Sequence, residues 1–275
     1  MESKLPPEFE TELKDFLEFI NTSYHYDFRD YAITSMKRTI LRAMDRMNCT
    51  SLAMLQAIMK TDPSRISELI QSLTIPVSEM FRDPGYFLAL REQVIPKLST
   101  YPSLKVWVAG CSTGEELYSL AILFAEASLL ERTVFYATDI NRISLEAARQ
   151  GMFAKNEMDL AEANYRKSGG QRVLSDYYGV TGANVIFAES LKKDVVFTEH
   201  SLANDEMFLE FHLISCRNVL IYFNRDLKDR AFGLLNESLR RRCFLGLGAK
   251  ETIHFSQHSS FFDPFVKSER IFQKH

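Results

Sequence analysis

Hydrophobic residues recur every three to four positions along the first part of the chain, which is the spacing of helices with one buried face. Such helices are expected over residues 9–20, 31–47, 51–60 and 64–73. In the first of them, the apolar positions on one face are Phe9, Leu13, Phe16, Leu17 and Ile20. Asp62-Pro63 breaks the pattern between the last two helices. We therefore expect residues 1–75 to form an all-α domain.

The pattern changes after Pro76. A linker over residues 76–98 contains a helix at 83–98, and short buried runs then alternate with helical segments. Strands are expected over residues 104–110, 133–140, 211–217 and 243–249, and helices over 114–130, 141–150 and 224–241. This alternation is typical of a doubly wound, mainly parallel sheet. Residues 99–275 are therefore predicted to form an α/β domain.

One segment departs from the alternation. In "ANVIFAESLKKDVVFTEH", residues 183–200, two β-rich runs flank the polar "ESLKKD". We interpret the two runs as the strands of a hairpin, within a small antiparallel β-subdomain inserted at about residues 171–200. The tail over residues 265–274 is expected to form a closing edge strand.

Composition excludes several classes of protein. The 275 residues are 46% hydrophobic and carry a net charge of −3. The chain therefore lacks the overall basic character of a protein that binds nucleic acid. A polar N-terminus and the lack of any run of 18 apolar residues argue against a signal peptide and membrane insertion. The four cysteines form no CxxC pair, which favours reduced thiols in a cytoplasmic protein. The six histidines do not cluster at metal-binding spacing, and no metal is expected.

The stretch "VWVAGCSTGEE" predicts a buried strand, a glycine turn and the start of a helix. Such a turn commonly binds phosphate, but Glu115 and Glu116 stand where an anion would lie. The spacing of Gly110 and Gly114 also departs from the GxGxxG of nicotinamide cofactor sites. S-adenosylmethionine suits the turn better, because it carries an ammonium and a sulfonium and no phosphate. The alternative is that the two acids only complement the helix N-terminus.

Asp139 ends the next predicted strand, about 25 positions after the turn, close to the ~20 expected of an acid that binds ribose hydroxyls. The alternative is a helix N-cap before the segment 141–150. Together with the acidic turn, Asp139 favours an S-adenosylmethionine pocket.

Four segments stand in order along the chain: "PVSEMFRDPGYFLALREQVIPKL", "VWVAGCSTGEELYSLAI", "ATDINRISLEAARQGMF" and "FHLISCRNVLIYF". Together they resemble the CheR family of chemoreceptor glutamate O-methyltransferases. The resemblance implies a Rossmann-like methyltransferase domain with a small β-subdomain, after an all-α N-terminal domain. It also implies methyl transfer from S-adenosylmethionine to receptor glutamates, with S-adenosylhomocysteine as the product.

The resemblance also assigns roles to individual residues. Arg82 and Tyr222 would face the transferred methyl group and the acceptor carboxylate. The cofactor would be bound by Ser78, Arg82, Glu115 or Glu116, Asp139, Ser201, Leu202, Arg217 and Asn218. Within this set, the acid of the turn would bind the methionine ammonium, Asp139 the ribose, and Ser201-Leu202 the adenine. Pro76 and Ser201 depart from the family pattern, which commonly has asparagine at both places.

The expected acceptor needs no general base, because a glutamate with a pKa near ~4.3 is already ionised at neutral pH. Its partner would be the acidic helical bundle of a chemoreceptor cytoplasmic domain. The second helix carries Lys37, Arg38, Arg42 and Arg46, which could steer that bundle or simply form a solvated face. We expect a monomer.

Three other functions stay open from the sequence. The first is a methyltransferase of another acceptor, although the segment "CRNVLIYF" lacks the Pro-Pro-Tyr element of DNA amino-methylating enzymes. The second is a catalytically idle relative that binds S-adenosylmethionine as a sensor. The third, a dehydrogenase, is disfavoured by the glycine spacing.

Overall fold

The computed structural model describes residues 7–74, 78–207 and 209–275. Its contacts divide the chain into two compact units. The first unit comprises Met1–Ile75 and Tyr222–Arg230, and the second comprises Pro76–Ile221 and Ala231–His275. Pro76, where the sequence departs from the family pattern, lies outside the described residues.

The first unit is helical, as the sequence predicts. Its helices are α1 (Pro7–Tyr24), α2 (Ile33–Arg46), α3 (Leu52–Thr61) and α4 (Ile66–Leu73). The expected apolar face of α1 is buried at Leu13, Phe16, Leu17 and Ile20. A short 3₁₀ turn, Pro63–Arg65, follows Asp62, whose carboxylate accepts a hydrogen bond from the Ser64 amide. The predicted break therefore has a local cause in the Asp-Pro pair.

A distant segment completes the helical unit. Phe223 forms an antiparallel bridge with Tyr31, and the centroids of their rings lie 4.9 Å apart. The Ala32 amide donates to the Tyr222 carbonyl at 2.8 Å, and the Asn224 side-chain amide donates to Asp30 at 3.0 Å. Nothing in the hydrophobic pattern predicted this return of the chain to the helices.

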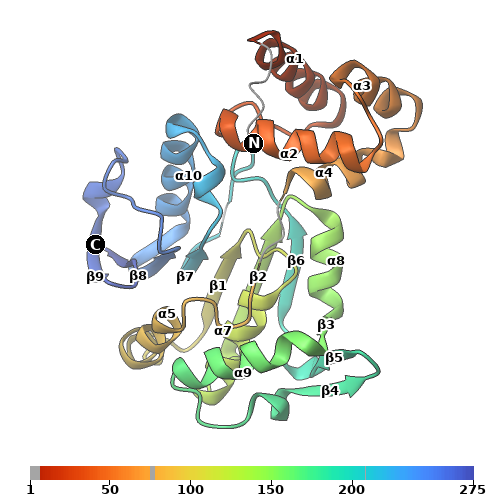
Figure 1. Ribbon diagram of the computed structural model, residues 1–275. Coiled ribbons are helices and arrows are strands. Elements are labelled where there is room, and N and C mark those ends of the chain that lie inside the picture. Colours follow the sequence, from red (N-terminus) through yellow and green to blue (C-terminus); the bar gives the residue numbers. More distant parts are fainter. Residues whose placement is uncertain (1–6, 75–77, 208) are drawn as a thin grey trace. The chain divides into compact units, whose positions relative to one another are not determined.

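The second unit is built on a seven-stranded sheet (Figure 1), whose order is β6-β2-β1-β7-β8-β10-β9. Its strands are β1 (Leu104–Ala109), β2 (Thr133–Asp139), β6 (Val195–Glu199), β7 (Phe211–Cys216), β8 (Leu239–Leu247), β9 (Phe262–Val266) and β10 (Ile271–Lys274). The five strands from β6 to β8 in this order run parallel, and the last two are antiparallel additions. The predicted parallel sheet is therefore confirmed.

Helices alternate with these strands along the chain. They are α5 (Pro84–Ala89), α6 (Ile95–Leu98), α7 (Glu115–Glu126), α8 (Arg142–Gln150), α9 (Met158–Lys167) and α10 (Arg225–Ser238). One π-helical turn, Leu90–Val94, joins α5 to α6. Pro96 lies two residues after this turn and lacks the N–H that would continue an α-helical ladder. The helix predicted over residues 83–98 is thus present with a local widening.

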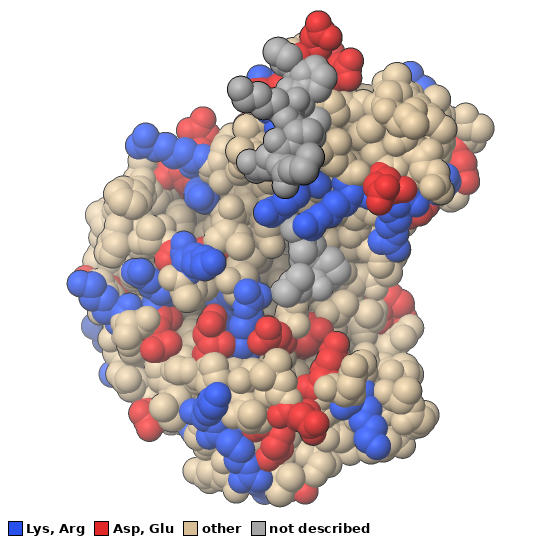
Figure 2. Space-filling view, viewed as in Figure 1, with Lys and Arg blue, Asp and Glu red and all other residues tan. Residues whose placement is uncertain are grey.

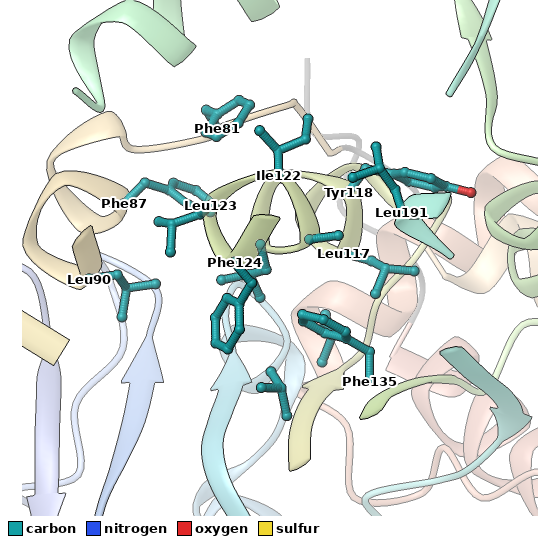
Figure 3. Close-up of a cluster of buried hydrophobic side chains, with 14 of the residues drawn as sticks. Phe81, Phe87, Leu90, Leu117, Tyr118, Ile122, Leu123, Phe124, Phe135 and Leu191 are labelled. Atoms are coloured by element: carbon teal, nitrogen blue, oxygen red, sulfur yellow. The ribbon is translucent and has the colours of Figure 1, made fainter. Parts of the chain in front are cut away.

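Aromatic and aliphatic side chains together surround α7 and form the core beside it (Figure 3). Phe81 and Phe87 lie on one side of the helix, and Phe135 of β2 lies on the other. Phe81 and Phe87 are fully buried, and their ring centroids are 5.2 Å apart. The Phe124 ring meets Phe135 edge-on at 5.3 Å. Because α7 begins just after the carboxyl end of β1, its N-terminal end lies at the carboxyl edge of the sheet.

The small antiparallel sheet is also present, but its strands differ from those expected. Its order is β3-β5-β4, formed by β3 (Met152–Ala154), β5 (Asn184–Phe187) and β4 (Tyr178–Thr181). The expected hairpin between the two flanks of "ESLKKD" is wrong, because the second flank is β6, a parallel strand of the large sheet. The actual hairpin joins β4 to β5 at Gly182, which has a φ of +61°.

The polar segment "ESLKKD", residues 189–194, contacts the end of α8 instead of forming the predicted hairpin turn. Lys192 donates from its ammonium to the carbonyls of Arg149 and Gln150, at 2.9 and 3.0 Å, and so caps the C-terminal end of α8. The sequence also predicts a single closing strand over residues 265–274, and this prediction is wrong. The tail forms a hairpin in which β9 is the edge and β10 lies inside.

Charged side chains of both signs are spread over the face shown in Figure 2, in line with the small net charge. All four cysteines are buried free thiols. Among the helices that the structure describes, none is both long and apolar enough to cross a bilayer.

Candidate active site

The order of the strands collects the predicted site residues. It reverses between β1 and β7, because the chain proceeds from β1 toward β6 in one direction and from β7 toward β9 in the other. Ligands of such sheets bind at the carboxyl ends of the strands beside this reversal. Glu115 follows β1, Asp139 ends β2, Ser201 follows β6 and Arg217 follows β7, so all four lie along that edge.

The turn between β1 and α7 is shaped by its glycines. Gly110 has a φ of +74° and Gly114 one of +102°, and both values favour glycine. A Cβ at Gly110 would lie 2.4 Å from a methyl group of Val219, which belongs to the loop after β7. The Gly110 and Cys111 amides both donate to the Thr138 carbonyl, which fixes the turn to β2. The turn is therefore packed between the ends of two neighbouring strands.

Glu115 is the buried acid of this turn, with 8% of its surface exposed. The Thr113 hydroxyl donates to its carboxylate, at 2.7 and 2.8 Å from the two oxygens. Burial raises the pKa of Glu115, and hydrogen bonds from Thr113 and Ser78 oppose the rise. Within the described parts of the chain, no cation forms an ion pair with this carboxylate. Glu115 is thus a buried acid held by neutral hydroxyl groups.

Glu116 has a different environment, because Arg217 neutralises it. The Arg217 guanidinium lies 2.9 Å from Glu116 and 2.8 Å from Asp83, and it also donates to the Arg82 carbonyl at 2.9 Å. Its plane lies over the Tyr86 ring, 4.2 Å from the centroid, and the residue is 6% exposed. Arg217 therefore ties the end of β7 to α7 and to the segment that carries Arg82.

The segment around Arg82 is held by α7 and α9 as well as by Arg217. The Phe81 amide donates to the Ser119 hydroxyl of α7 at 2.9 Å, and the Asn164 side chain of α9 donates to the Met80 carbonyl at 3.2 Å. Phe81 and Asp83, on either side of Arg82, both adopt the left-handed region, with φ of 52° and 55°. Non-glycine residues are uncommon there and cost energy that the surrounding contacts must offset. Arg82 itself is half-buried.

Asp139 contacts the glycine turn. Its carboxylate accepts from the Ser112 amide at 2.8 Å and from the Asn141 amide at 2.9 Å. Burial raises its pKa, while these backbone hydrogen bonds oppose the rise. The helix N-cap is Asn141, whose side-chain oxygen accepts from the Ile143 and Ser144 amides. The capping alternative for Asp139 is therefore wrong, and its carboxylate is left to organise the turn.

Ser201 and Leu202 follow β6, next to Asp139, whose carbonyl accepts from the His200 amide at 3.2 Å. The Ser201 hydroxyl accepts from the Ala203 amide at 3.2 Å, so it closes a local turn. Leu202 is buried.

Asn218 follows Arg217 in the left-handed region, with a φ of 61°. Tyr222 belongs to the other unit, with the helices. The other predicted site residues all belong to the second unit.

Sequence reasoning missed three residues that hold the site. Thr113 and Asp83 lie within the quoted motifs and contact Glu115 and Arg217, respectively. Glu251 follows β8 and accepts hydrogen bonds from the loop after β7. An acid at the carboxyl end of a parallel strand was the available signal. Among the described residues, no group of three or more potential metal ligands gathers.

Two family descriptions match the chain. "CheR methyltransferase, SAM binding domain" matches residues 76–269, and "CheR methyltransferase, all-alpha domain" matches residues 11–74. SAM denotes S-adenosylmethionine.

The chain is also similar to individual proteins. A putative methyltransferase Cher3 of Pseudomonas putida is 53% identical over 263 residues, which cover 96% of each chain. A chemotaxis protein methyltransferase of Listeria innocua is 31% identical over 249 residues, covering 90% of this chain and 92% of the relative. Among solved structures, magnesium protoporphyrin IX methyltransferase from Synechocystis, with bound SAH, is 20% identical with a TM-score of 0.33. That match covers 61% of this chain and 58% of the other, less than two thirds of its length.

Proposed function

The chain belongs to the CheR family of SAM-dependent methyltransferases, and we propose that it methylates glutamate side chains of chemoreceptor cytoplasmic domains. The observation that carries the proposal is Glu115, a buried carboxylate at the glycine turn whose partners are neutral hydroxyls. A buried acid of this kind is costly unless a cation joins it. The methionine ammonium of the cofactor is such a cation.

The remaining residues of the edge fit the same cofactor. Asp139 would accept from the ribose hydroxyls, while it keeps the turn in place through the Ser112 amide. Leu202 would supply apolar surface for the adenine, and the Ser201 hydroxyl, engaged in its own turn, would contribute little. Ser78 and Asn218 would close the pocket. When bound, S-adenosylmethionine supplies a methyl group on a sulfonium, which a carboxylate can accept without a general base.

The protein would then have to align the acceptor carboxylate with the methyl group. We assign that role to Arg82, whose guanidinium can hold a carboxylate by two parallel hydrogen bonds. Arg217 is assigned to positioning instead of cofactor binding, because its terminal nitrogens already bind Glu116, Asp83 and the Arg82 carbonyl. Tyr222 would orient the acceptor through its hydroxyl.

The acceptor protein would be an acidic helical bundle, approached by α2. Of the four basic residues predicted there, Lys37 pairs with Glu10 at 2.8 Å and Arg46 donates to Gln71 at 3.3 Å. Arg38 and Arg42 are exposed, and no ion pair within the described residues holds them. We therefore assign the steering of the bundle mainly to Arg38 and Arg42. The enzyme would act as a monomer in the cytoplasm.

The test is methyl transfer from radiolabelled S-adenosylmethionine to purified receptor cytoplasmic fragments. A glutamate methyl ester is cleaved by mild alkali and releases its label as methanol, whereas a methylated amine keeps it. Alkali-stable label would identify another acceptor class. Cofactor binding without any transfer to a panel of fragments would favour the idle sensor.

Arg82→Ala is expected to lower turnover by about 10²-fold, because lost orientation costs that much. Affinity for S-adenosylhomocysteine should change much less, as should the melting temperature. Arg82→Lys should rescue turnover only in part, because an ammonium lacks the planar fork. Tyr222→Phe tests its hydroxyl in the same assay, and Arg149→Ala, an exposed arginine of α8, is the control. Wild-type turnover in Arg82→Ala would refute the alignment role.

A further inference from the structure

Glu251 is a buried acid that the proposed mechanism does not use. It is 4% exposed and lies just after β8. Its carboxylate accepts from the amides of Gly248 at 2.7 Å, Asn218 at 2.9 Å and Ile221 at 3.3 Å. Burial raises its pKa, and the backbone hydrogen bonds, including one from Leu220, oppose the rise. Two of these three amides, those of Asn218 and Ile221, belong to the loop that follows β7.

That loop, residues 217–221, needs an external support. Asn218 adopts the left-handed region, which asparagine tolerates better than most residues but still at a cost. After Ile221 the chain leaves the second unit for the helical one. Because one carboxylate binds both Asn218 and Ile221, it spans the loop from its second residue to its last.

The same loop touches the turn that presents Glu115. Val219 occupies the space that a side chain at Gly110 would fill. A shift of the loop would therefore release Val219 from the turn and move Asn218 away from the pocket. The effect would reach the cofactor without any contact between Glu251 and the cofactor.

We propose that Glu251 is a positioning residue, which holds the 217–221 loop against the β1–α7 turn and so completes the cofactor pocket. This inference rests on the proposed function, because it assigns the pocket to S-adenosylmethionine. The carboxylate form matters, since all its lone pairs accept. A glutamine would turn two N–H donors toward a nest of N–H donors and leave some of them unpaired.

The test compares Glu251→Gln with Glu126→Gln in the full-length protein. Glu126 is also an acid of the second unit with a largely covered side chain, which is 5% exposed. It lies at the other end of α7, where it pairs with Arg91 at 2.6 Å and accepts from Tyr177 at 3.1 Å. The readouts are calorimetric affinity for S-adenosylhomocysteine, the KM for S-adenosylmethionine, and the melting temperature without ligand. Both substitutions are expected to lower the melting temperature.

We expect Glu251→Gln to weaken S-adenosylhomocysteine binding by about tenfold or more and to raise KM in parallel. Glu126→Gln should bind as the wild type does. If Glu251→Gln does not fold, Glu251→Asp decides, because it keeps the charge but shortens the reach and should weaken binding with little loss of stability. Wild-type affinity in the folded Glu251 variants would overturn the inference. Failure of the wild-type protein to bind S-adenosylhomocysteine would instead refute the proposed function.

Discussion

The two adjacent acids Glu115 and Glu116 have different partners, and their tertiary neighbours cause the difference. Neighbouring positions on a helix point about 100° apart, so one motif can present two different carboxylates. Arg217, 101 positions away in the sequence, neutralises Glu116 and leaves Glu115 with hydroxyl partners. The sequence could predict that an acid of the turn binds the cofactor. The sequence could not show which of the two acids has an ionic partner, because that depends on the distant arginine.

Glu115→Gln is expected to weaken S-adenosylhomocysteine binding by about 1.5–3 kcal/mol, the value of a hydrogen bond to a charged group. The pH dependence should change as well. Binding of an ammonium requires the ionised carboxylate, so wild-type affinity should fall as the pH drops through the raised pKa of Glu115, above the ordinary 4.5. The variant should lose this dependence. Calorimetry at a series of pH values from 4.5 upward measures both effects.

With rising pH, the stability of the ligand-free protein should change in the opposite direction to its cofactor affinity. A carboxyl group whose pKa is higher in the folded than in the unfolded chain binds its proton more tightly when folded. The ligand-free protein should therefore lose stability as the pH rises from 4.5 through the raised pKa, and Glu115→Gln should melt no lower than wild type at neutral pH. Glu116→Gln is the contrast, because it removes a partner of Arg217 and should lower the melting temperature. Equal loss of cofactor affinity in both variants would contradict the distinction between the two acids.

At the scale of elements, the alternation of apolar and polar runs predicted the parallel strands and their helices. It failed where an element's role depends on a tertiary partner. The polar segment before β6 looked like a hairpin turn, yet Lys192 in it caps α8. The tail was predicted as one strand, and the left-handed Arg270 allows it to turn into a hairpin. Such outcomes depend on contacts that no local pattern contains.

Gly110→Ala tests how closely the β1–α7 turn is packed. Gly182→Ala is the matched control, because Gly182 also has a positive φ but nothing lies within 4 Å of the Cβ position. The control should lose about 1–2 kcal/mol, the backbone cost alone. Gly110→Ala should lose more and should also weaken cofactor binding, because Val219 must move. Denaturant unfolding and calorimetry measure the two quantities, and equal losses of stability would show that the turn is not tightly packed.

At the scale of the whole molecule, the sequence predicted a helical part before an α/β part, and the four quoted motifs predicted the family, which is confirmed. The contribution of residues 222–230 to the helical unit could not be predicted from the sequence pattern. Phe223 has its partner, Tyr31, near the other end of the sequence. Phe223 ends the apolar run VLIYF, and nothing in that run shows that its last residue packs on the helices.

Phe223→Ala is expected to destabilise the helical unit by about 3–5 kcal/mol, the usual cost for a buried phenylalanine. Hydrogen exchange should show the loss in the amides of α2 to α4 more than in those of β1 and β7. Phe255→Ala is the control, because Phe255 is 84% exposed and should change stability by less than about 0.5 kcal/mol. A loss of protection confined to the sheet would mean that Phe223 supports the second unit instead.

Because residues 222–230 complete the helical unit, recombination that exchanges only the first 75 residues should disrupt that unit. A genetic crossover near residue 75 would transfer α1 to α4 from one parent but would leave Phe223 and Asn224 with the other. Tyr31 and Asp30 would then face foreign partners. Natural relatives should therefore exchange the helical unit rarely, and its bridge positions should vary in pairs across the family. A working chimera needs two junctions, with the short distant segment transferred together with the helices.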